Sequence, residues 1–382
     1  MKPVICLLLT LSLLLAPVGA VDCLYDDAIT IQAPSACLLE KTSGQVLYEK
    51  NAHEHRLIAS VTKVMTLLLI MEALDNGSIA LEDMVTASAH ACSMGGSQIW
   101  LEEGEQMTVD EMLKCITVVS ANDCAVAMAE HIAGTEDAFV QKMNEKAAAL
   151  GMNDTHFTDC TGLFDDPEHY SCAFDVAIMA RELISHEKIK DYSTIWMDTA
   201  RDGEFSLSNT NKLIYYYDGA TGLKTGYTSK AGHCLAATAQ RDGVEYVAVV
   251  LGTDSGDHRF DSAKTLLNYA FANYTLCRLL PEDALPPIPV NLGKADCVQP
   301  VYPAVDQAVI EKSRAANLRY DLQLMEAAEA PVAAGDPLGT LTVYSGDEPI
   351  AELTVTAGQT VERMGTFGIF ARMLDILACK PV

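Results

Sequence analysis

A stretch of apolar residues behind a serine and a lysine constrains this chain more than any other feature. From Val64 to Met71 every residue but one is apolar, so a helix here would have no polar face and must be surrounded by core. Ser60 and Lys63 precede it at a spacing that places both side chains on one helix face. Because a helix start presents free N–H groups and a positive dipole end, the pattern suits a serine nucleophile with an amine base. The same spacing recurs at Ser185–Lys188, to which we assign no role, so the spacing alone is not diagnostic.

The chain is long enough for more than one domain, and its start is typical of an export signal. It has 382 residues, whereas single cores usually stop growing at about 250–300 residues. Lys2 is followed by a leucine-rich run over 5–15 and by small residues over 18–20. A membrane span needs ~20 apolar residues, so an uncleaved anchor is the weaker alternative. We therefore predict a signal peptide over residues 1–20 and an exported bacterial protein, at the outer face of the cytoplasmic membrane or in the cell wall space.

Charge and cysteine usage exclude several kinds of partner. The formal net charge is −26, and a surface of that sign repels nucleic acid, so we expect no nucleic-acid partner. Of the twelve cysteines one lies in the predicted signal, and the odd remainder leaves at least one thiol unpaired within the chain. Cys160 and Cys172 could close a loop. No Cys-x-x-Cys pair occurs, and His53-Glu54-His55 lacks the His-Glu-x-x-His spacing, so we predict a polar turn there and no metal.

The alternation of strand and helix patterns predicts an α+β fold. Two apolar runs joined by a Thr-Ser-Gly turn form a predicted β-hairpin near the start, over 36–39 and 46–49. Mostly helical segments follow up to about residue 185, and further strands are predicted over 222–228, 234–239 and 244–251. Helices between two groups of strands favour one antiparallel sheet assembled from both ends of the domain.

The remainder of the chain divides into three shorter units. Residues 21–278 would form the main domain, and the proline-rich segment 279–290 reads as a linker. Residues 291–363 alternate like strands around Gly and Asp turns, which predicts a small β-rich domain. The apolar helix predicted over 364–382 is too short to cross a bilayer core of ~30 Å. Two roles fit it, namely lying in the membrane interface as an anchor or packing as a terminal helix.

Two further short motifs occur once each and in order. Ser120-Ala121-Asn122 falls in a predicted loop between helices, and Lys224-Thr225-Gly226 falls on a predicted strand near the sheet edge. Either could be an ordinary helix end or strand end by itself. Together with the Ser60 and Lys63 pair, in this order and in these contexts, they are hard to attribute to chance.

These residues identify a resemblance to a known family. With its Ser-x-x-Lys, Ser-x-Asn and Lys-Thr-Gly motifs, the chain resembles the serine-type D-alanyl-D-alanine carboxypeptidases, the low-molecular-mass penicillin-binding proteins. Residues 209–213 and 222–228 look like the family's stretch around its third motif, and 330–339 looks like its β-rich appendage. The resemblance implies a penicillin-binding transpeptidase-like (β-lactamase-like) domain, no cofactor, peptidoglycan stem peptides ending in D-Ala-D-Ala as substrate, and β-lactams as inhibitors.

The resemblance also implies roles for the motif residues. Ser60 would attack the penultimate D-Ala carbonyl and form an acyl-enzyme. Lys63 would take its proton, which requires a pKa below ~10.4 that burial or a neighbouring cation, here Lys224, would provide. Ser120 would relay a proton to the leaving amine, and Asn122 would hold the substrate amide and orient Lys63.

Binding roles fall mainly on the third motif. Thr225 with Lys224 would bind the terminal carboxylate, with Gly226 beside them in the substrate-binding strand. The backbone N–H groups of Ser60 and Tyr227 would form the oxyanion hole. Arg259 aligns with a family arginine near the carboxylate, although an ordinary surface arginine at a helix start fits its position equally well.

Two departures from the family pattern and two rival functions stay open at this point. Tyr227 stands where some members carry His, and Asp159-Cys160 replaces a frequent Asn-Pro pair before Thr161. A class A β-lactamase shares the three motifs but needs a Glu-x-x-x-Asn loop, whereas here Glu168 is followed by Cys172 four residues on. A non-catalytic penicillin sensor or wall-binding protein is the second alternative.

Overall fold

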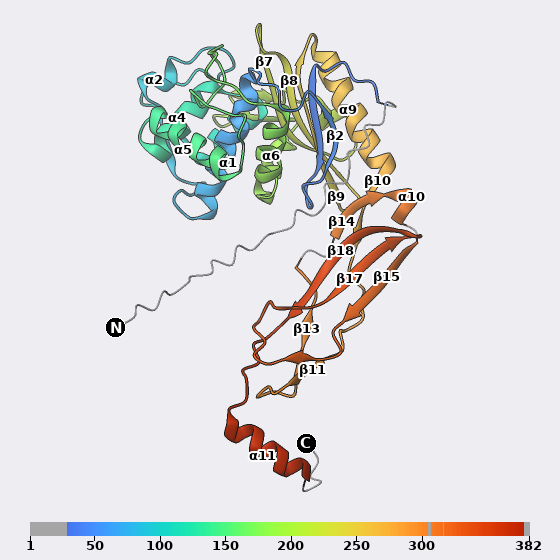
Figure 1. Cartoon of the computed structure of the whole chain (residues 1–382). Helices are drawn as coiled ribbons and strands as arrows, with labels where there is room; N and C mark the ends of the chain where they lie inside the picture. Colours follow the sequence, from blue (N-terminus) through green and yellow to red (C-terminus); the bar gives the residue numbers. More distant parts are fainter. Residues whose placement is uncertain (1–28, 305–306, 316, 378–382) are drawn as a thin grey trace, which may run out of the picture.

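The computed structural model describes residues 29–304, 307–315 and 317–377. The predicted signal peptide over 1–20 therefore lies outside the described residues. Figure 1 shows an upper α+β part, a lower part built of strands, and a single helix at the far end. This arrangement confirms the predicted fold class of an α+β domain with a small β-rich domain behind it.

One antiparallel sheet organises the upper part, as the sequence predicts. Its strands are β1 (Ser35–Glu40), β2 (Val46–Lys50), β7 (Ala220–Thr228), β8 (Gly232–Arg241) and β9 (Val244–Thr253). They run in the order β2-β1-β9-β8-β7, so the N-terminal hairpin pairs with strands from more than 160 residues later. The β8–β9 turn has positive φ at Asp242 (51°) and Gly243 (81°), which a two-residue hairpin of this twist requires. The strand β7, which carries the third motif, forms one edge.

Both faces of the sheet are covered, which explains the continuous apolar sequence of its central strand. Along β9, Val247 and Val249 pack into the core shared with the helices before the sheet, whereas Tyr246 and Ala248 pack into the core under α9 (Gly256–Asn273). Figure 1 shows α9 on one side of the sheet and the helical cluster on the other. A strand buried on both faces has no position where water would favour a polar side chain.

The helical cluster surrounds α1 (Lys63–Asp75), the predicted all-apolar helix, most of whose side chains are buried. Apart from α8 (Leu213–Tyr216), whose Leu213 is buried in the core under α9, the α-helices between α1 and β7 belong to this cluster, namely α2 (Ala89–Cys92), α3 (Val109–Val118), α4 (Asn122–Ala133), α5 (Glu136–Ala149), α6 (Ala173–Leu183) and α7 (Lys190–Ser193). Short hairpins flank it, formed by β3 (Met84–Thr86) with β4 (Gln106–Thr108) and by β5 (Met197–Ala200) with β6 (Phe205–Ser208). The Thr108 hydroxyl accepts the Glu111 N–H at 3.2 Å, so the predicted cap starts α3.

Ser60 does not lie in the α-helix itself. It lies in η1 (Ala59–Thr62), a 3-10 turn that leads into α1, and Ala59 before it has a positive φ of 48°. Gly162, from the loop between α5 and α6, packs directly on this turn. A Cβ atom on Gly162 would fall 1.9 Å from the Ala59 carbonyl oxygen. The close approach is therefore possible only without a side chain at position 162.

The proline-rich segment predicted as a linker over 279–290 is more ordered than the sequence indicates. Leu280 and Leu285 are buried against Leu341 and Val355 of the lower part, and Ile288 begins strand β11 (Ile288–Asn291). Strand β10 (Tyr274–Arg278) directly follows α9 and pairs with β14 (Gln307–Glu311), so the two parts share a strand pair. The prolines interrupt any helix or strand pattern in this part of the sequence. Leu280 and Leu285 are nevertheless buried in the structure.

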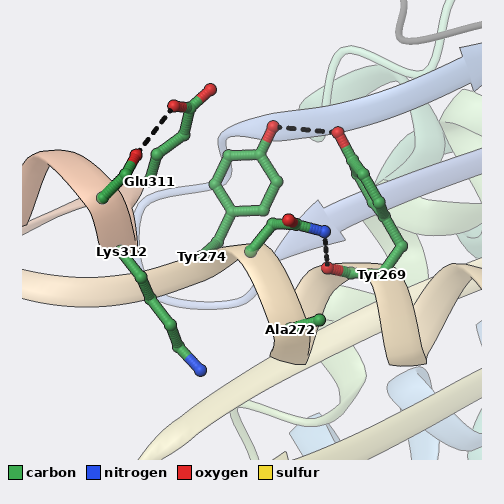
Figure 2. Close-up of a pocket in the computed structure, with 7 residues that line it drawn as sticks. Tyr269, Ala272, Tyr274, Glu311 and Lys312 are labelled. Carbon is green, nitrogen blue, oxygen red and sulfur yellow. Dashed lines mark hydrogen bonds between the residues drawn. The ribbon is translucent and has the colours of Figure 1, made fainter. Parts of the chain in front are cut away.

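A polar pocket marks this junction. Figure 2 shows Tyr269 and Tyr274 from the upper part facing Glu311 and Lys312 from the lower part, where α10 (Lys312–Ala315) begins. The two tyrosine hydroxyls lie 3.3 Å apart, and Lys312 Nζ donates to the Phe271 carbonyl at 2.6 Å. The hydrogen bond from Lys312 ties the end of α9 to the lower part.

The lower part is a small β-rich unit with a helix at its end. Its strands form the sheets β13-β18-β17-β15 and β12-β11-β16, with β12 (Cys297–Val298), β13 (Pro300–Val301), β15 (Leu318–Leu324), β16 (Ala328–Glu329), β17 (Pro337–Ser345) and β18 (Glu348–Ala357). These strands pair antiparallel except for β11 with β16, which are parallel. The final helix is α11 (Thr366–Leu377). Within the described ranges, no helix has the length and apolar character that a membrane crossing requires.

Replacing Gly162 by alanine should destabilise the fold more than backbone strain alone can explain. Gly162 has a φ of +69° and no room for a Cβ, whereas Gly151 has a similar φ of +74° with nothing within 4 Å of the Cβ position. We expect Gly151→Ala to lower the free energy of unfolding by about 1–2 kcal/mol, the cost of left-handed backbone. Gly162→Ala should cost about 2–5 kcal/mol because overpacking adds to that strain. Urea unfolding would measure both, and equal losses in the two variants would contradict the close packing on η1.

Candidate active site

Ser60 and Lys63 meet where η1 passes into α1. Lys63 Nζ lies 3.0 Å from Ser60 Oγ and donates a second hydrogen bond of 2.8 Å to the Thr161 carbonyl. The Lys63 side chain is fully buried, with 0% exposure. The predicted spacing therefore brings the serine hydroxyl within hydrogen-bond distance of a buried amine.

Burial makes this amine a far weaker base than an ordinary lysine. It lowers the pKa of Lys63 from 10.5 to about 8, because the ammonium form loses its contact with water. Cys160, Asp159 and Asp123 act in the opposite direction and raise the pKa, but they do not offset the effect of burial. The neutral amine, which is the form that accepts a proton, is consequently populated at a much lower pH.

A tight turn in the loop after α5 presents the Thr161 carbonyl to Lys63. Asp159 Oδ1 accepts the N–H and the hydroxyl of Thr161, both at 2.7 Å, and the N–H of Gly162 at 2.6 Å. The Thr66 hydroxyl of α1 donates to the Cys160 carbonyl at 2.6 Å. Asp159, which stands where the family frequently has Asn, thus gives the loop a defined shape, because its side chain accepts hydrogen bonds from the backbone N–H groups that follow it. Cys160 is a free thiol here, as is Cys172, so they do not close the loop.

A buried histidine fixes the far end of the same loop. The Thr158 N–H donates to His169 Nδ1 at 3.1 Å, which leaves the His169 proton on Nε2, 2.8 Å from the Thr62 hydroxyl of η1. Burial lowers the pKa of His169, in keeping with a neutral ring. Sequence analysis missed both His169 and Thr161, because their partners lie about a hundred residues away along the chain.

Ser120 and Asn122 stand at the start of α4, and each has a buried polar atom without a hydrogen-bond partner among the described residues. Ser120 is buried with a positive φ of 66°, and its Oγ has no hydrogen-bond partner among the described residues. Asn122 Nδ2 donates to the Gly95 carbonyl at 2.7 Å, while its buried Oδ1 is likewise without a partner in the described part of the chain. Strained backbone and unsatisfied buried atoms are typical of positions that meet a ligand.

The edge strand β7 supplies a second buried lysine. Lys224 is 1% exposed, and its Nζ donates to the Thr225 carbonyl at 2.9 Å. Burial, with repulsion from Lys63 and Arg259, lowers the pKa of Lys224 well below its ordinary value. The sequence analysis made Lys224 the cation that depresses the pKa of Lys63. In the structure burial is the main cause for both amines, and Lys224 itself lacks a carboxylate partner among the described residues.

Gly226 brings β7 against the serine turn. A Cβ atom there would lie 2.7 Å from the Ile58 carbonyl oxygen and 3.1 Å from the Ser60 nitrogen, so only glycine allows this approach. The next residue, Tyr227, is exposed, and its ring stacks on His233 with centroids 4.3 Å apart. The strand therefore brings the backbone at Gly226, directly before Tyr227, against the Ser60 backbone.

Arg259 reaches the same strand from α9. Its Nη1 donates to the carbonyls of Gly226 at 3.2 Å and Cys234 at 3.3 Å, and its buried Nε has no partner among the described residues. Burial lowers the pKa of Arg259 to about 10. The guanidinium is thus held beside the third motif, unlike the surface arginine that the sequence left open.

Hydrogen bonds link the second motif to the third. Thr225 Oγ1 donates to Thr210 Oγ1 at 2.8 Å, and the Thr210 N–H donates to the carbonyl of Val118, two residues before Ser120. All three motifs are therefore connected through packed or hydrogen-bonded backbone. The repeat of the spacing at Ser185–Lys188 is different, because both residues are exposed and Ser185 Oγ donates to Glu182.

The comparisons with known proteins agree with this site. The model of the D-alanyl-D-alanine carboxypeptidase family, peptidase S11, matches residues 24–255, and the model of the penicillin-binding protein 5 C-terminal domain matches residues 283–363. D-alanyl-D-alanine carboxypeptidase DacF of Bacillus subtilis is 41% identical over 348 residues, covering 90% of this chain and 89% of that protein. DacD of Escherichia coli is 31% identical, covering 90% of each chain.

Solved structures show the same relationship. Penicillin-binding protein 5 of Haemophilus influenzae superposes with a TM-score of 0.80 at 28% identity, covering 88% of this chain and 99% of that one. Penicillin-binding protein D2 of Listeria monocytogenes, solved in an ampicillin-bound form, has a TM-score of 0.59 at 28% identity and covers 64% of this chain and 99% of that one. The β-lactamase alternative is not favoured, and Glu168, on which it depended, is exposed. The chain therefore belongs to the D-alanyl-D-alanine carboxypeptidase family, the penicillin-binding serine peptidases that act on peptidoglycan stem peptides.

Proposed function

We propose that this chain releases the terminal D-alanine of peptidoglycan stem peptides through an acyl-enzyme on Ser60. The single observation that carries the assignment is the buried Lys63 amine, 3.0 Å from Ser60 Oγ and with its pKa lowered to about 8. Lys63 accepts the hydroxyl proton as Oγ attacks the penultimate D-Ala carbonyl. The peptide bond breaks, an ester forms on Ser60 and free D-alanine leaves. Water then hydrolyses the ester and regenerates the serine.

The proton must travel from Lys63 to the departing amine, and Ser120 is the proposed relay. Its buried Oγ is available because the fold leaves it without a partner among the described residues. Asn122 Oδ1 is available in the same way and would accept the substrate amide N–H. The N–H groups of Ser60 and Tyr227, which Gly226 allows to approach each other, would stabilise the oxyanion.

The terminal carboxylate of the substrate would bind to the third motif. Lys224 and Thr225 of β7, with Arg259 reaching the strand from α9, bring two basic groups and a hydroxyl together, and burial disfavours the charged form of both basic groups while no anion is present. An incoming carboxylate would restore the charged form of Lys224 and gain charge-assisted hydrogen bonds. The site is thus selective for substrates that end in a free carboxylate, which is the defining feature of a carboxypeptidase.

A fluorescent penicillin tests the nucleophile. We expect the protein to form a covalent, denaturation-resistant adduct, and Ser60→Ala to lose both this adduct and the release of D-alanine from an N-acyl-Lys-D-Ala-D-Ala peptide. Ser185→Ala is the matched control, because it has the same spacing to a lysine but is exposed, and it should label like the parent. Labelling that survives in Ser60→Ala would refute the assignment. Labelling without D-alanine release would favour the penicillin-sensor alternative.

We further propose that the protein is exported and that α11 holds it at a membrane surface. Phe367, Phe370, Leu374 and Leu377 recur at helical spacing and are exposed, the first by 87% and the last by 77%. A helix with an apolar face of this kind lies in the interface between lipid headgroups and acyl chains. Export delivers the chain to the compartment of its peptidoglycan substrate, and the anchor would keep it at the wall-facing side of the membrane.

Sedimentation with phosphatidylethanolamine–phosphatidylglycerol vesicles tests the anchor. We expect the protein without residues 1–20 to pellet with vesicles, and Phe367→Glu/Phe370→Glu to stay largely in the supernatant because charged side chains do not enter the acyl region. Both proteins should still label with penicillin, since α11 lies at the far end of the molecule from the upper part that carries the candidate site (Figure 1). Equal sedimentation of the two proteins would rule out α11 as the anchor.

A further inference from the structure

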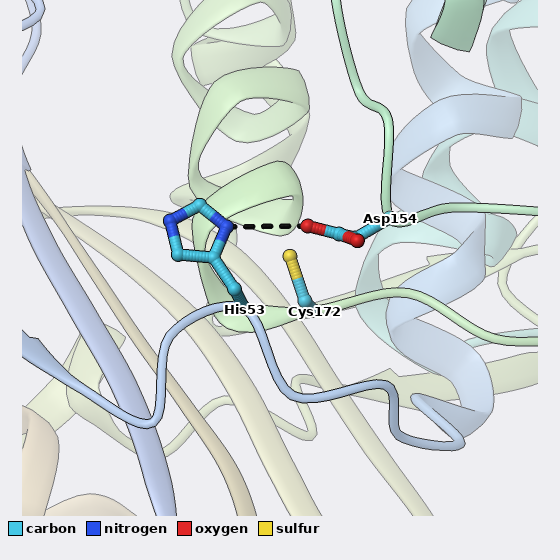
Figure 3. Close-up of side chains that lie close together, drawn as sticks. All are labelled: His53, Asp154 and Cys172. Atoms are coloured by element: carbon cyan, nitrogen blue, oxygen red, sulfur yellow. Dashed lines mark hydrogen bonds and ion pairs between the residues drawn. The ribbon is translucent and has the colours of Figure 1, made fainter.

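A histidine, an aspartate and a cysteine from three distant segments converge outside the candidate active site. His53 lies between β2 and η1, Asp154 lies in the turn after α5, and Cys172 caps the start of α6. Their nearest ligand atoms all lie within 4.8 Å of one another. Figure 3 shows the His53 ring hydrogen-bonded to Asp154, with the Cys172 sulfur pointing toward the space between them. Sequence analysis predicted a polar turn at His53 without a metal, since the other two residues are about a hundred positions away.

The spacing of the His53 and Asp154 atoms fits two ligands of a single tetrahedral metal ion, with the Cys172 sulfur within 4.8 Å of both residues' ligand atoms. His53 Nδ1 and Asp154 Oδ2 lie 3.2 Å apart. Two such ligands at the usual zinc distances and a tetrahedral angle would be separated by about 3.4 Å. A sulfur, an imidazole nitrogen and one carboxylate oxygen form a ligand set that prefers zinc and its neighbours over magnesium or calcium.

Surrounding groups already orient the three ligands. His55 Nε2 lies 3.1 Å from Asp154 Oδ1, the oxygen that does not face His53. Asp175 accepts the backbone N–H of Asp154 at 2.8 Å, and its own N–H donates to Cys172 Sγ at 3.3 Å. Partners of this kind fix the position and basicity of metal ligands.

A second group of possible ligands serves as a contrast within the same molecule. Glu72, Glu182 and His186 also bring ligand atoms within 4.8 Å. There, however, Lys146 Nζ already lies 2.6 Å from Glu72 and 3.4 Å from Glu182, and His186 pairs with Asp75. The ammonium group of Lys146 therefore occupies the position that a metal ion would take in that cluster. Among the described residues, Asp154 of the first cluster pairs only with His53 and His55, and no lysine or arginine occupies that site.

We infer that His53 Nδ1, Asp154 Oδ2 and Cys172 Sγ form a binding site for one divalent transition metal ion of the zinc class, with water as the fourth ligand. Cys172 binds as the thiolate, and its proton is released to solvent when the metal binds. The inference does not depend on the proposed function, because none of the three residues takes part in that chemistry.

The metal would brace the loop that serves Lys63. Asp154 and Cys172 flank residues 159–162, which present the Thr161 carbonyl, and His53 belongs to the segment that leads into Ser60. Arg56 and Ser171 already exchange backbone hydrogen bonds of 2.8 and 3.0 Å between these segments. A metal bond among three of their residues would join them far more firmly, so His53, Asp154 and Cys172 act as positioning residues.

Cobalt substitution provides the sharpest test. The mature full-length protein, purified with reductant and stripped of metal, would be titrated with Co²⁺ and then with Zn²⁺. We expect one equivalent of Co²⁺ to produce a thiolate charge-transfer band that Zn²⁺ removes. Cys172→Ser should lose the band while keeping a side-chain acceptor for the α6 cap, and His53→Ala should weaken binding of both ions. His55→Ala should weaken it by about 10–100-fold, the usual effect of losing an orienting partner.

The controls separate this site from adventitious binding to other thiols or histidines. His186→Ala, in the contrasting cluster, should bind Co²⁺ like the parent. Zn²⁺ should raise the melting temperature of the parent and of His186→Ala but not that of Cys172→Ser. Far-ultraviolet circular dichroism verifies that each variant is folded. A band that persists in Cys172→Ser, or the absence of any one-to-one binding in the parent, would overturn the inference.

Discussion

The whole site depends on keeping the Lys63 amine in the core without a directly bound carboxylate. Its only hydrogen bonds are to Ser60 Oγ and the Thr161 carbonyl within the described structure. Taking an ammonium group out of water is costly, so burial lowers the pKa of Lys63 and favours the neutral amine, which can serve as a base. A carboxylate in direct contact would have restored the ordinary pKa and removed the catalytic use of the residue.

Much of the surrounding architecture follows from that requirement. The helix α1 is apolar on all sides because it must carry Lys63 into the centre of the upper part. Gly162 and Gly226 let two backbone segments close over the serine turn, where any side chain would collide with it. The second buried lysine, Lys224, lacks a carboxylate partner among the described residues, and in the proposed function the carboxylate of the substrate would supply one. The burial of apolar side chains in the two cores, one on each face of the sheet, offsets the destabilisation at these positions.

Sequence alone predicted the fold class, the sheet built from both ends of the domain and the motif residues, because each depended on local pattern or on spacing within a few residues. It could not foresee that Thr161 holds Lys63, since that contact spans about a hundred residues. It predicted a linker over residues 279–290 because the prolines there interrupt helix and strand patterns. The burial of Leu280 and Leu285 depends on residues of the lower part that are distant along the chain, so the sequence did not indicate it. It also predicted that His53 belongs to a polar turn. Asp154 and Cys172, which the fold brings next to His53, lie in other segments of the sequence, so the cluster was not visible there.

The most direct test of this account is the titration of Lys63 itself. Carbon NMR of protein labelled with ¹³C at the lysine side chains, with the Lys63 signal assigned by its loss in Lys63→Arg, would follow the charge on this one amine. We predict a midpoint at about pH 8, with the neutral amine accumulating as the pH rises through that value. A Lys63 signal that titrates near the ordinary lysine value of ~10.4 would contradict the claim that burial makes it the base for Ser60.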